Sequence, residues 1–126
     1  MTTWLLMGMA LYLVTAYIPS LMLLQVIGVG KYLGTRDDPP APKPHHARAI
    51  RARDNFRENL PVFLGLGLLV LITPEADQSI ALRGAQAFVL SRLVYLPAYI
   101  SGVPFIRSAA FMLGWCGLLA MALALL

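Results

Sequence analysis

The fold is decided by residues 51–64, which read RARDNFRENLPVFL. This strongly polar segment leads straight into the uncharged run 60–73, which holds only 14 residues. At about 1.5 Å per residue that run is about 21 Å long, less than the roughly 30 Å of a bilayer's hydrocarbon core. Open backbone is not tolerated in lipid. A membrane-crossing helix must therefore begin earlier, within residues 51–59, which places Asn55 and Glu58 at or just inside the membrane boundary.

The rest of the chain has the composition of a membrane protein. Of its 126 residues, 59% are hydrophobic and 13% are charged, whereas about 25% of a typical soluble domain is charged. Residues 2–30 and 108–126 contain no charged side chain, and each run approaches or exceeds the roughly 20 apolar residues of a membrane span. The first run is too long for a signal peptide and has no Lys or Arg before it. We therefore predict an integral membrane protein.

Chain length predicts four membrane spans in one all-α domain, a four-helix bundle covering residues 1–126. About 20 residues per span account for about 80, and the remainder suffices only for connections. We place the spans at about 3–29, 52–73, 80–101 and 107–126. Residues 31–46 hold four prolines and should form an extended connection, and Pro19 should kink the first span. Cys116, the single cysteine, offers no intramolecular disulfide and no Cys-based metal site, so we predict no metal.

The Lys and Arg residues predict the orientation of the spans. Seven lie between the first span and the start of the second: Lys31, Arg36, Lys43, Arg48, Arg51, Arg53 and Arg57. Arg107 lies at the other connection on that side, whereas the opposite side holds only Arg83. Because cytoplasmic loops carry the excess of Lys and Arg, both termini should be non-cytoplasmic. The net charge of +4 then reports topology, and no soluble basic region exists to bind nucleic acid.

Every predicted span brings polar groups to the cytoplasmic level. In the second span they are spaced i, i+4, i+7, which puts them within about 60° of one another on one helix face. The set comprises Lys31 in the first span, Arg51, Asn55 and Glu58 in the second, Arg92, Tyr95 and Tyr99 in the third, and Arg107 at the start of the fourth. Ionisable groups at membrane depth cost about 2.5–3.5 kcal/mol each, so they usually face the protein interior and are paired.

Two interpretations of this set compete. In the structural one, the interfacial arginines extend their charged ends to water, and Glu58 forms an ion pair with Arg92. In the functional one, the residues bind a ligand, because Asn55 and two tyrosines are not needed to neutralise a charge. Several guanidinium groups suit a ligand with more than one carboxylate, whereas Glu58 and Asn55 suit an ammonium and peptide groups. Glutathione fits this description, and a cation or hydroxyl would stabilise its reactive thiolate.

The same residues carry a family resemblance. The stretch 51–64 resembles the second-helix signature of the MAPEG family (membrane-associated proteins in eicosanoid and glutathione metabolism), with the pattern Arg-Ala-x-x-Asn-x-x-Glu-x-x-Pro. Arg92-Leu93-x-Tyr95-x-x-x-Tyr99 is similar to the third-helix motif, and Ile106-Arg107-Ser108 to the start of the fourth helix. Leu24-Gln25-Val26-Ile27, followed by Lys31, is similar to the end of the first helix. The chain thus resembles a bacterial-type member related to microsomal glutathione transferases and to leukotriene and prostaglandin E synthases.

The resemblance implies a left-handed four-helix bundle that assembles as a homotrimer in the bacterial inner membrane. Glutathione, as co-substrate, would lie between neighbouring subunits at the cytoplasmic side, and a lipophilic substrate would reach it from the bilayer lipid. Arg107 would stabilise the thiolate. The expected glutathione-binding residues are Lys31, Arg51, Asn55, Glu58, Arg92, Tyr95 and Tyr99.

Three functions stay open at this point. The first is a glutathione transferase or peroxidase acting on a hydrophobic electrophile. The second is a small four-span transporter that uses Glu58 for proton coupling. The third is a non-catalytic lipid-binding protein of the same fold. Thiol-dependent turnover would distinguish the first function from the other two.

Overall fold

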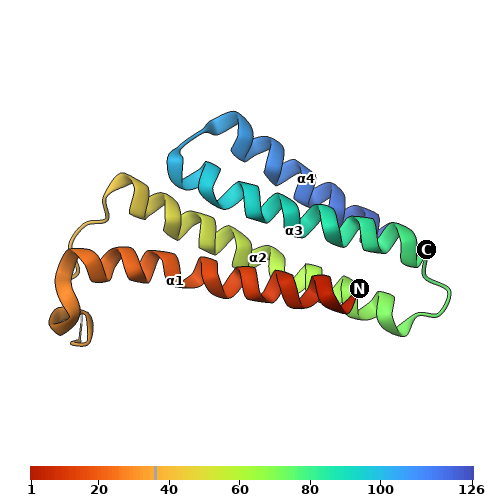
Figure 1. Ribbon diagram of the computed structural model, residues 1–126, viewed down its shortest axis with the longest axis horizontal. Coiled ribbons are helices and arrows are strands. Elements are labelled where there is room, and N and C mark those ends of the chain that lie inside the picture. The colour runs from red at the N-terminus through yellow and green to blue at the C-terminus, as the bar shows by residue number, and fades with distance from the viewer. Residues whose placement is uncertain (36) are drawn as a thin grey trace.

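The computed structural model describes residues 1–35 and 37–126, and within them the secondary structure is entirely helical. The helices are α1 (Thr2–Tyr32), α2 (Pro44–Ile72), α3 (Gln78–Ser101) and α4 (Pro104–Leu123). They lie side by side along the long axis of the molecule (Figure 1). The all-α bundle is therefore as predicted. Arg36, counted above among the topology-setting cations, lies outside the described residues.

The ends of the helices follow local sequence rules. The N-cap of α3 is Asp77, whose carboxylate accepts hydrogen bonds from the backbone N–H groups of Ser79 and Ile80, both at 2.9 Å. The C-cap of α3 is Gly102, in the left-handed conformation with φ 79°. The second helix begins at Pro44, earlier than the membrane span expected from about residue 52. Residues 44–46 are therefore helical rather than extended, because proline is well tolerated in the first turn of a helix.

The first helix is interrupted near its C-terminal end. Gly28 has φ 75° and ψ 165°, outside the helical region, whereas the backbone remains helical at Pro19. The interruption of the helix lies nine residues after Pro19, at a residue without a Cβ, and the kink expected at Pro19 stays a prediction. The last turn, which carries Lys31, leaves the axis of the helix at this point (Figure 1).

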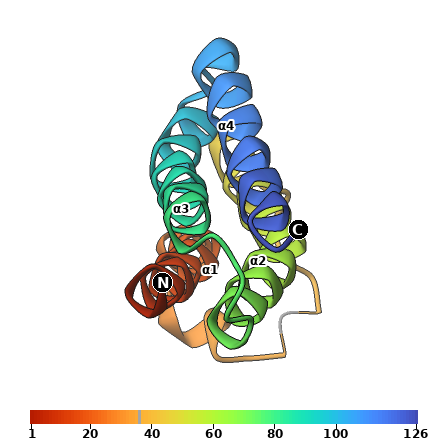
Figure 2. The ribbon, with the colours of Figure 1, turned by 90° about the vertical axis from the view of Figure 1, so that its right-hand side faces the viewer.

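Glycines allow the helices to approach one another closely. Figure 2 shows α3 and α4 as one pair lying over α1 and α2. A Cβ on Gly84 would lie 2.6 Å from the carbonyl oxygen of Gly117, and the reverse distance is also 2.6 Å. Between the pairs, the rings of Phe63 in α2 and Phe88 in α3 are stacked with their centroids 4.4 Å apart, and both side chains are fully buried. Close helix approach at small residues is typical of membrane bundles.

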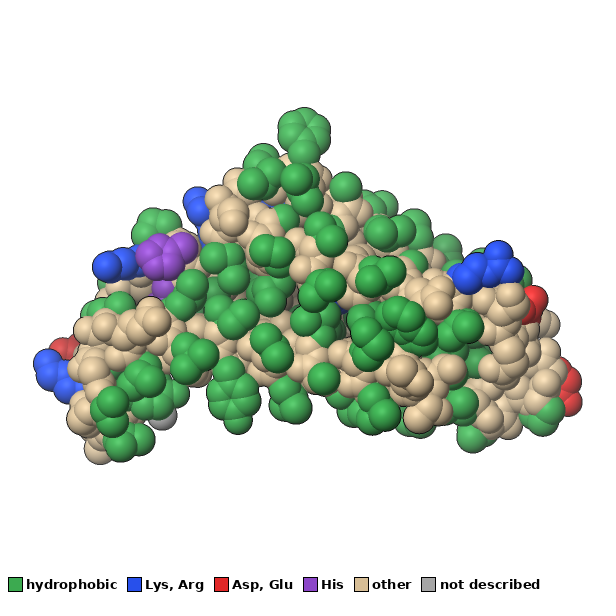
Figure 3. Space-filling view, in the orientation of Figure 1, with side chains coloured by type: hydrophobic (Ala, Val, Ile, Leu, Met, Phe, Trp, Pro, Cys, Tyr) green, Lys and Arg blue, Asp and Glu red, His purple; other side chains and the backbone are tan. Residues whose placement is uncertain are grey.

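The outside of the bundle suits a lipid environment. By length and composition, α1, α2 and α4 can each cross a membrane. α3 contains no comparably apolar stretch, but its 24 residues would span about 36 Å, and it packs against both α2 and α4. Hydrophobic side chains cover the middle of the molecule, whereas Lys, Arg and His gather near the α1–α2 connection (Figure 3). The protein is an integral membrane helical bundle; the fourth crossing and the orientation stay predictions.

Candidate functional site

Arg92 lies at the centre of the candidate site. Arg92 is only 1% exposed, and its side chain is the largest fully buried one among the described residues. Its Nη1 donates a hydrogen bond of 2.8 Å to Oδ1 of Asn55, which links α3 to α2. Its Nε and Nη2 have no hydrogen-bond partner within the described residues. The structure thus joins two of the predicted site residues directly.

Aromatic rings enclose this guanidinium. Its central carbon lies 5.0 Å from the ring centroid of Phe88, 5.3 Å from that of Tyr95 and 5.7 Å from that of Phe111. These distances are within the range of cation–π interactions. On the α4 side the guanidinium faces Gly114, where an added Cβ would lie 2.9 Å from Nη2. Arg92 therefore occupies a slot that exists because residue 114 has no side chain.

An open groove adjoins this enclosed centre. It has a volume of about 340 Å³ and is lined by Tyr95, Tyr99, Arg107, Ser108, Phe111 and Met112. Tyr95 is buried, and its ring lies 5.3 Å from that of Tyr99. The guanidinium carbon of Arg107 lies 5.0 Å from the ring centroid of Tyr99. The groove therefore has two phenol rings and one cation in its walls.

Arg107 has a second source of positive potential beside it. The N-cap of α4 is Val103, and the backbone N–H of Arg107 donates to the Val103 carbonyl at 3.2 Å. Arg107 is thus in the first turn of α4, where the unsatisfied N–H groups of a helix act as roughly half a positive charge. An anion bound in the groove would be attracted by both the side chain and the helix end.

The remaining predicted site residues are not gathered by the single chain. Arg51 and Glu58 are exposed on α2. Within residues 1–35 and 37–126 no ion pair joins Glu58 to Arg92, so the structural interpretation of that pair was wrong; Arg92 bonds Asn55 instead. Lys31 is exposed beyond the break at Gly28 and lines a separate cavity of about 620 Å³ with Asp38. None of these three side chains lines the groove.

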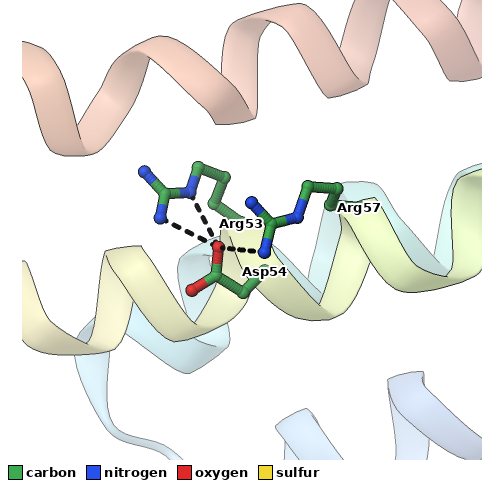
Figure 4. A network of polar contacts seen from close by, with 3 residues as sticks. All are labelled: Arg53, Asp54 and Arg57. Carbon is green, nitrogen blue, oxygen red and sulfur yellow. Dashed lines mark hydrogen bonds and ion pairs between the residues drawn. The ribbon is translucent and has the colours of Figure 1, made fainter.

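Three neighbouring charged side chains on α2 form a polar network that was not predicted from the sequence. Arg53 donates to Oδ1 of Asp54 from Nε at 3.0 Å and from Nη2 at 2.8 Å. Arg57 approaches the same oxygen at 3.6 Å. Figure 4 shows the three side chains meeting in the space between α1 and α2. The i, i+3 spacing of Asp54 and Arg57 was the available signal. Asp54 therefore partly neutralises the charges of Arg53 and Arg57.

The role of Gly114 was also not predicted from the sequence, because a glycine in an apolar helix shows no sign of what it faces.

Within the described residues, no group of three or more His, Cys, Asp and Glu side chains is placed to hold a metal ion.

In a comparison with protein families, the family described as MAPEG matches residues 1–126, the full length. No individual curated protein matches the chain.

Proposed function

The chain belongs to the MAPEG family, and on this premise we propose that it is a glutathione-dependent membrane enzyme. The family includes glutathione-dependent transferases and peroxidases as well as non-catalytic members. The reaction we propose is attack of the glutathione thiolate on a lipophilic electrophile. In a transferase the sulfur forms a bond to carbon and the leaving group departs. In a peroxidase the sulfur attacks an oxygen of the hydroperoxide, the O–O bond breaks and an alcohol leaves. The thiol of a second glutathione then attacks the resulting sulfenic acid, giving glutathione disulfide and water.

The observation that carries the proposal is the position of Arg107. Its guanidinium lies beside Tyr99, in the wall of an open groove and in the first turn of α4. A free thiol titrates near pH 8.5, so only a few per cent is ionised at neutral pH unless a positive charge lowers its pKa. Arg107 and the helix end together supply that charge. We therefore assign Arg107 as the catalytic residue.

The binding residues divide into two groups. Tyr95 and Tyr99 line the groove, Arg92 lies against the Tyr95 ring, and Asn55 is joined to Arg92 by a hydrogen bond. The exposed group comprises Lys31, Arg51 and Glu58. We propose that a homotrimer brings the exposed group of one subunit to the groove of its neighbour. Two carboxylates of glutathione would then meet the cations, and its ammonium would meet Glu58.

Two measurements on purified protein in mild detergent test the proposal. Calorimetric titration should show glutathione binding, and turnover of 1-chloro-2,4-dinitrobenzene or of a lipid hydroperoxide should require glutathione. Binding without turnover of either substrate would indicate a non-catalytic member of the family. Absence of glutathione binding would overturn the proposal as a whole.

A further inference from the structure

We propose that Arg92 acts on the ligand only through Asn55, by fixing the Asn55 amide with its NH₂ group turned toward the ligand. Arg92 is then a positioning residue rather than a glutathione contact. Only the identity of the ligand as glutathione rests on the proposed function. The contact between Arg92 and Asn55 is a feature of the chain itself.

The chemistry of the two groups determines which way the amide faces. A guanidinium has five N–H donors and no acceptor, whereas an asparagine side chain has one oxygen acceptor and one NH₂ donor. Arg92 must therefore meet Oδ1 of Asn55, as it does at 2.8 Å. Turning the amide by 180° would place two donors against each other next to a buried charge. Arg92 thus removes the freedom of this amide to present its oxygen to a ligand.

The opposite side of the amide remains available. Within the described residues, Nδ2 of Asn55 has no hydrogen-bond partner, and the residue is partly exposed on α2. Nδ2 of the neighbouring Asn59 donates to the backbone carbonyl oxygen of Asn55 at 2.7 Å, so Asn59 does not compete for the side-chain amide of Asn55. Asn55 therefore offers donors to a ligand, and the ligand group that fits is a carboxylate or a peptide carbonyl.

Arg92 itself is shut off from any ligand in the groove. With 1% of its surface exposed, it lies behind Tyr95 and Phe111, whose side chains line the groove. Gly114 leaves room for Nη2, and Ser91 adjoins the same slot with its Oγ donating to the Phe88 carbonyl at 2.7 Å. The guanidinium cannot move toward the groove without displacing an aromatic ring. Its influence must pass through the one polar group that it contacts.

A double-mutant cycle on glutathione affinity tests the ligand side of the proposal. Arg92→Met should weaken binding about tenfold or more in the wild-type background, because the Asn55 amide is then no longer held with its NH₂ group toward the ligand. In the Asn55→Ala background the same change should alter affinity no more than about twofold, because Arg92 then has nothing to position. Arg92→Lys, which keeps a donor and the charge, should recover part of the affinity. Equal losses in both backgrounds would overturn the proposal.

A second arm needs no ligand, so it decides the inference even if glutathione does not bind. The chain contains only two asparagines, Asn55 and Asn59. Selective ¹⁵N-asparagine labelling therefore gives two side-chain NH₂ signals in an NMR spectrum, which Asn59→Ala assigns. Loss of Arg92 should shift the Asn55 signal toward that of a freely rotating amide and accelerate its hydrogen exchange. An unchanged Asn55 signal in Arg92→Met would refute the positioning role.

Gly114→Ala provides a variant that keeps the charge and the hydrogen-bonding groups. Its Cβ would lie 2.7 Å from Oγ of Ser91 and 2.9 Å from Nη2 of Arg92, so it should displace both groups and shift the Asn55 signal in the same direction. Gly65→Ala is the matched control, because nothing lies within 4 Å of a Cβ at that position of α2. A shift of equal size in both variants would show that the signal reports helix stability rather than Arg92.

Discussion

The α3–α4 pair and the N-terminal half of α2 differ in how their charged side chains are surrounded. Arg92 in α3 is enclosed by three rings and a glycine slot, and a single copy of the chain builds all of that surrounding. On α2, Arg51 and Glu58 are exposed and lack polar contacts within the described residues. One chain builds the whole surrounding of Arg92. The exposed residues of α2, by contrast, would contribute to ligand binding only if a neighbouring subunit covers them, as in the proposed homotrimer. The proposed site lies where the two regions meet, at Asn55.

The largest expected effect concerns the groove of the α3–α4 pair. Arg107→Leu should lower turnover by one to three orders of magnitude, the scale of losing a preorganised stabilising group, while glutathione affinity falls much less. Because Arg107 favours the charged thiolate, its loss should raise the pKa of the bound thiol, so that activity recovers as the pH rises toward 8.5 and above. Ultraviolet thiolate absorbance against pH measures this directly. A bound-thiol pKa identical to wild type would transfer the role to Tyr95 or Tyr99.

Next in size is the packing between α3 and α4. Gly117→Ala would set a Cβ 2.6 Å from the Gly84 carbonyl oxygen, and backbone on both helices would have to move. We expect a loss of about 1–3 kcal/mol of stability, the cost of overpacking a close contact. Thermal unfolding in detergent is the measurement, with Gly65→Ala as the control that should be neutral or slightly stabilising. Equal melting temperatures would mean that the two helices are not held at this distance.

A smaller effect is expected on the exposed side of the comparison. Glu58→Gln should weaken glutathione binding about tenfold through loss of a charge-assisted hydrogen bond to the ammonium. Its melting temperature should stay at the wild-type value, because Glu58 is exposed and makes no polar contact within the described part of the chain. Arg83→Gln, exposed at the opposite end of the bundle, is the matched control and should leave affinity unchanged. A destabilised Glu58 variant with normal glutathione affinity would show that Glu58 has a structural role and not a binding role.

The smallest effect should come from Asp54→Asn. Its ion pairs with Arg53 and Arg57 are partly exposed to solvent, with side-chain exposures of 29% and 33% for the first pair. Such pairs contribute about 1 kcal/mol at most, so the free energy of unfolding should change by less than that. The measurement is chemical or thermal unfolding at low and high salt. A loss well above this range would show that the network holds α1 against α2.

The sequence reveals the helices far better than it reveals the surroundings of the site residues. Long uncharged runs predict the first and last helices, and chain length together with the shorter apolar runs predicts the middle two, because few other structures satisfy the backbone in lipid. The periodicity of Arg51, Asn55 and Glu58 places them near one face of α2. It cannot predict that Asn55 turns toward Arg92 while its two neighbours stay exposed, because that depends on how α3 packs.

Two further features depend on tertiary structure in the same way. The slot at Gly114 is defined by a side chain 22 positions earlier, on another helix, and local sequence carries no trace of it. The break at Gly28 depends on a positive φ that glycine permits but does not require. Pro19 was the stronger sequence signal, but the backbone at this position, in the middle of α1, keeps helical angles.

The break at Gly28 also changes how the protein relates to bilayer thickness. A straight helix of 31 residues would be about 46 Å long, well beyond the roughly 30 Å of hydrocarbon, and would have to tilt steeply or thicken the membrane around it. Because the axis ends at Gly28, the straight part is shorter and the final turn is free to follow the headgroup layer. We therefore expect Lys31 to stay near the lipid phosphates when the membrane becomes thinner or thicker. The break at Gly28 would let the first helix adjust to hydrophobic mismatch.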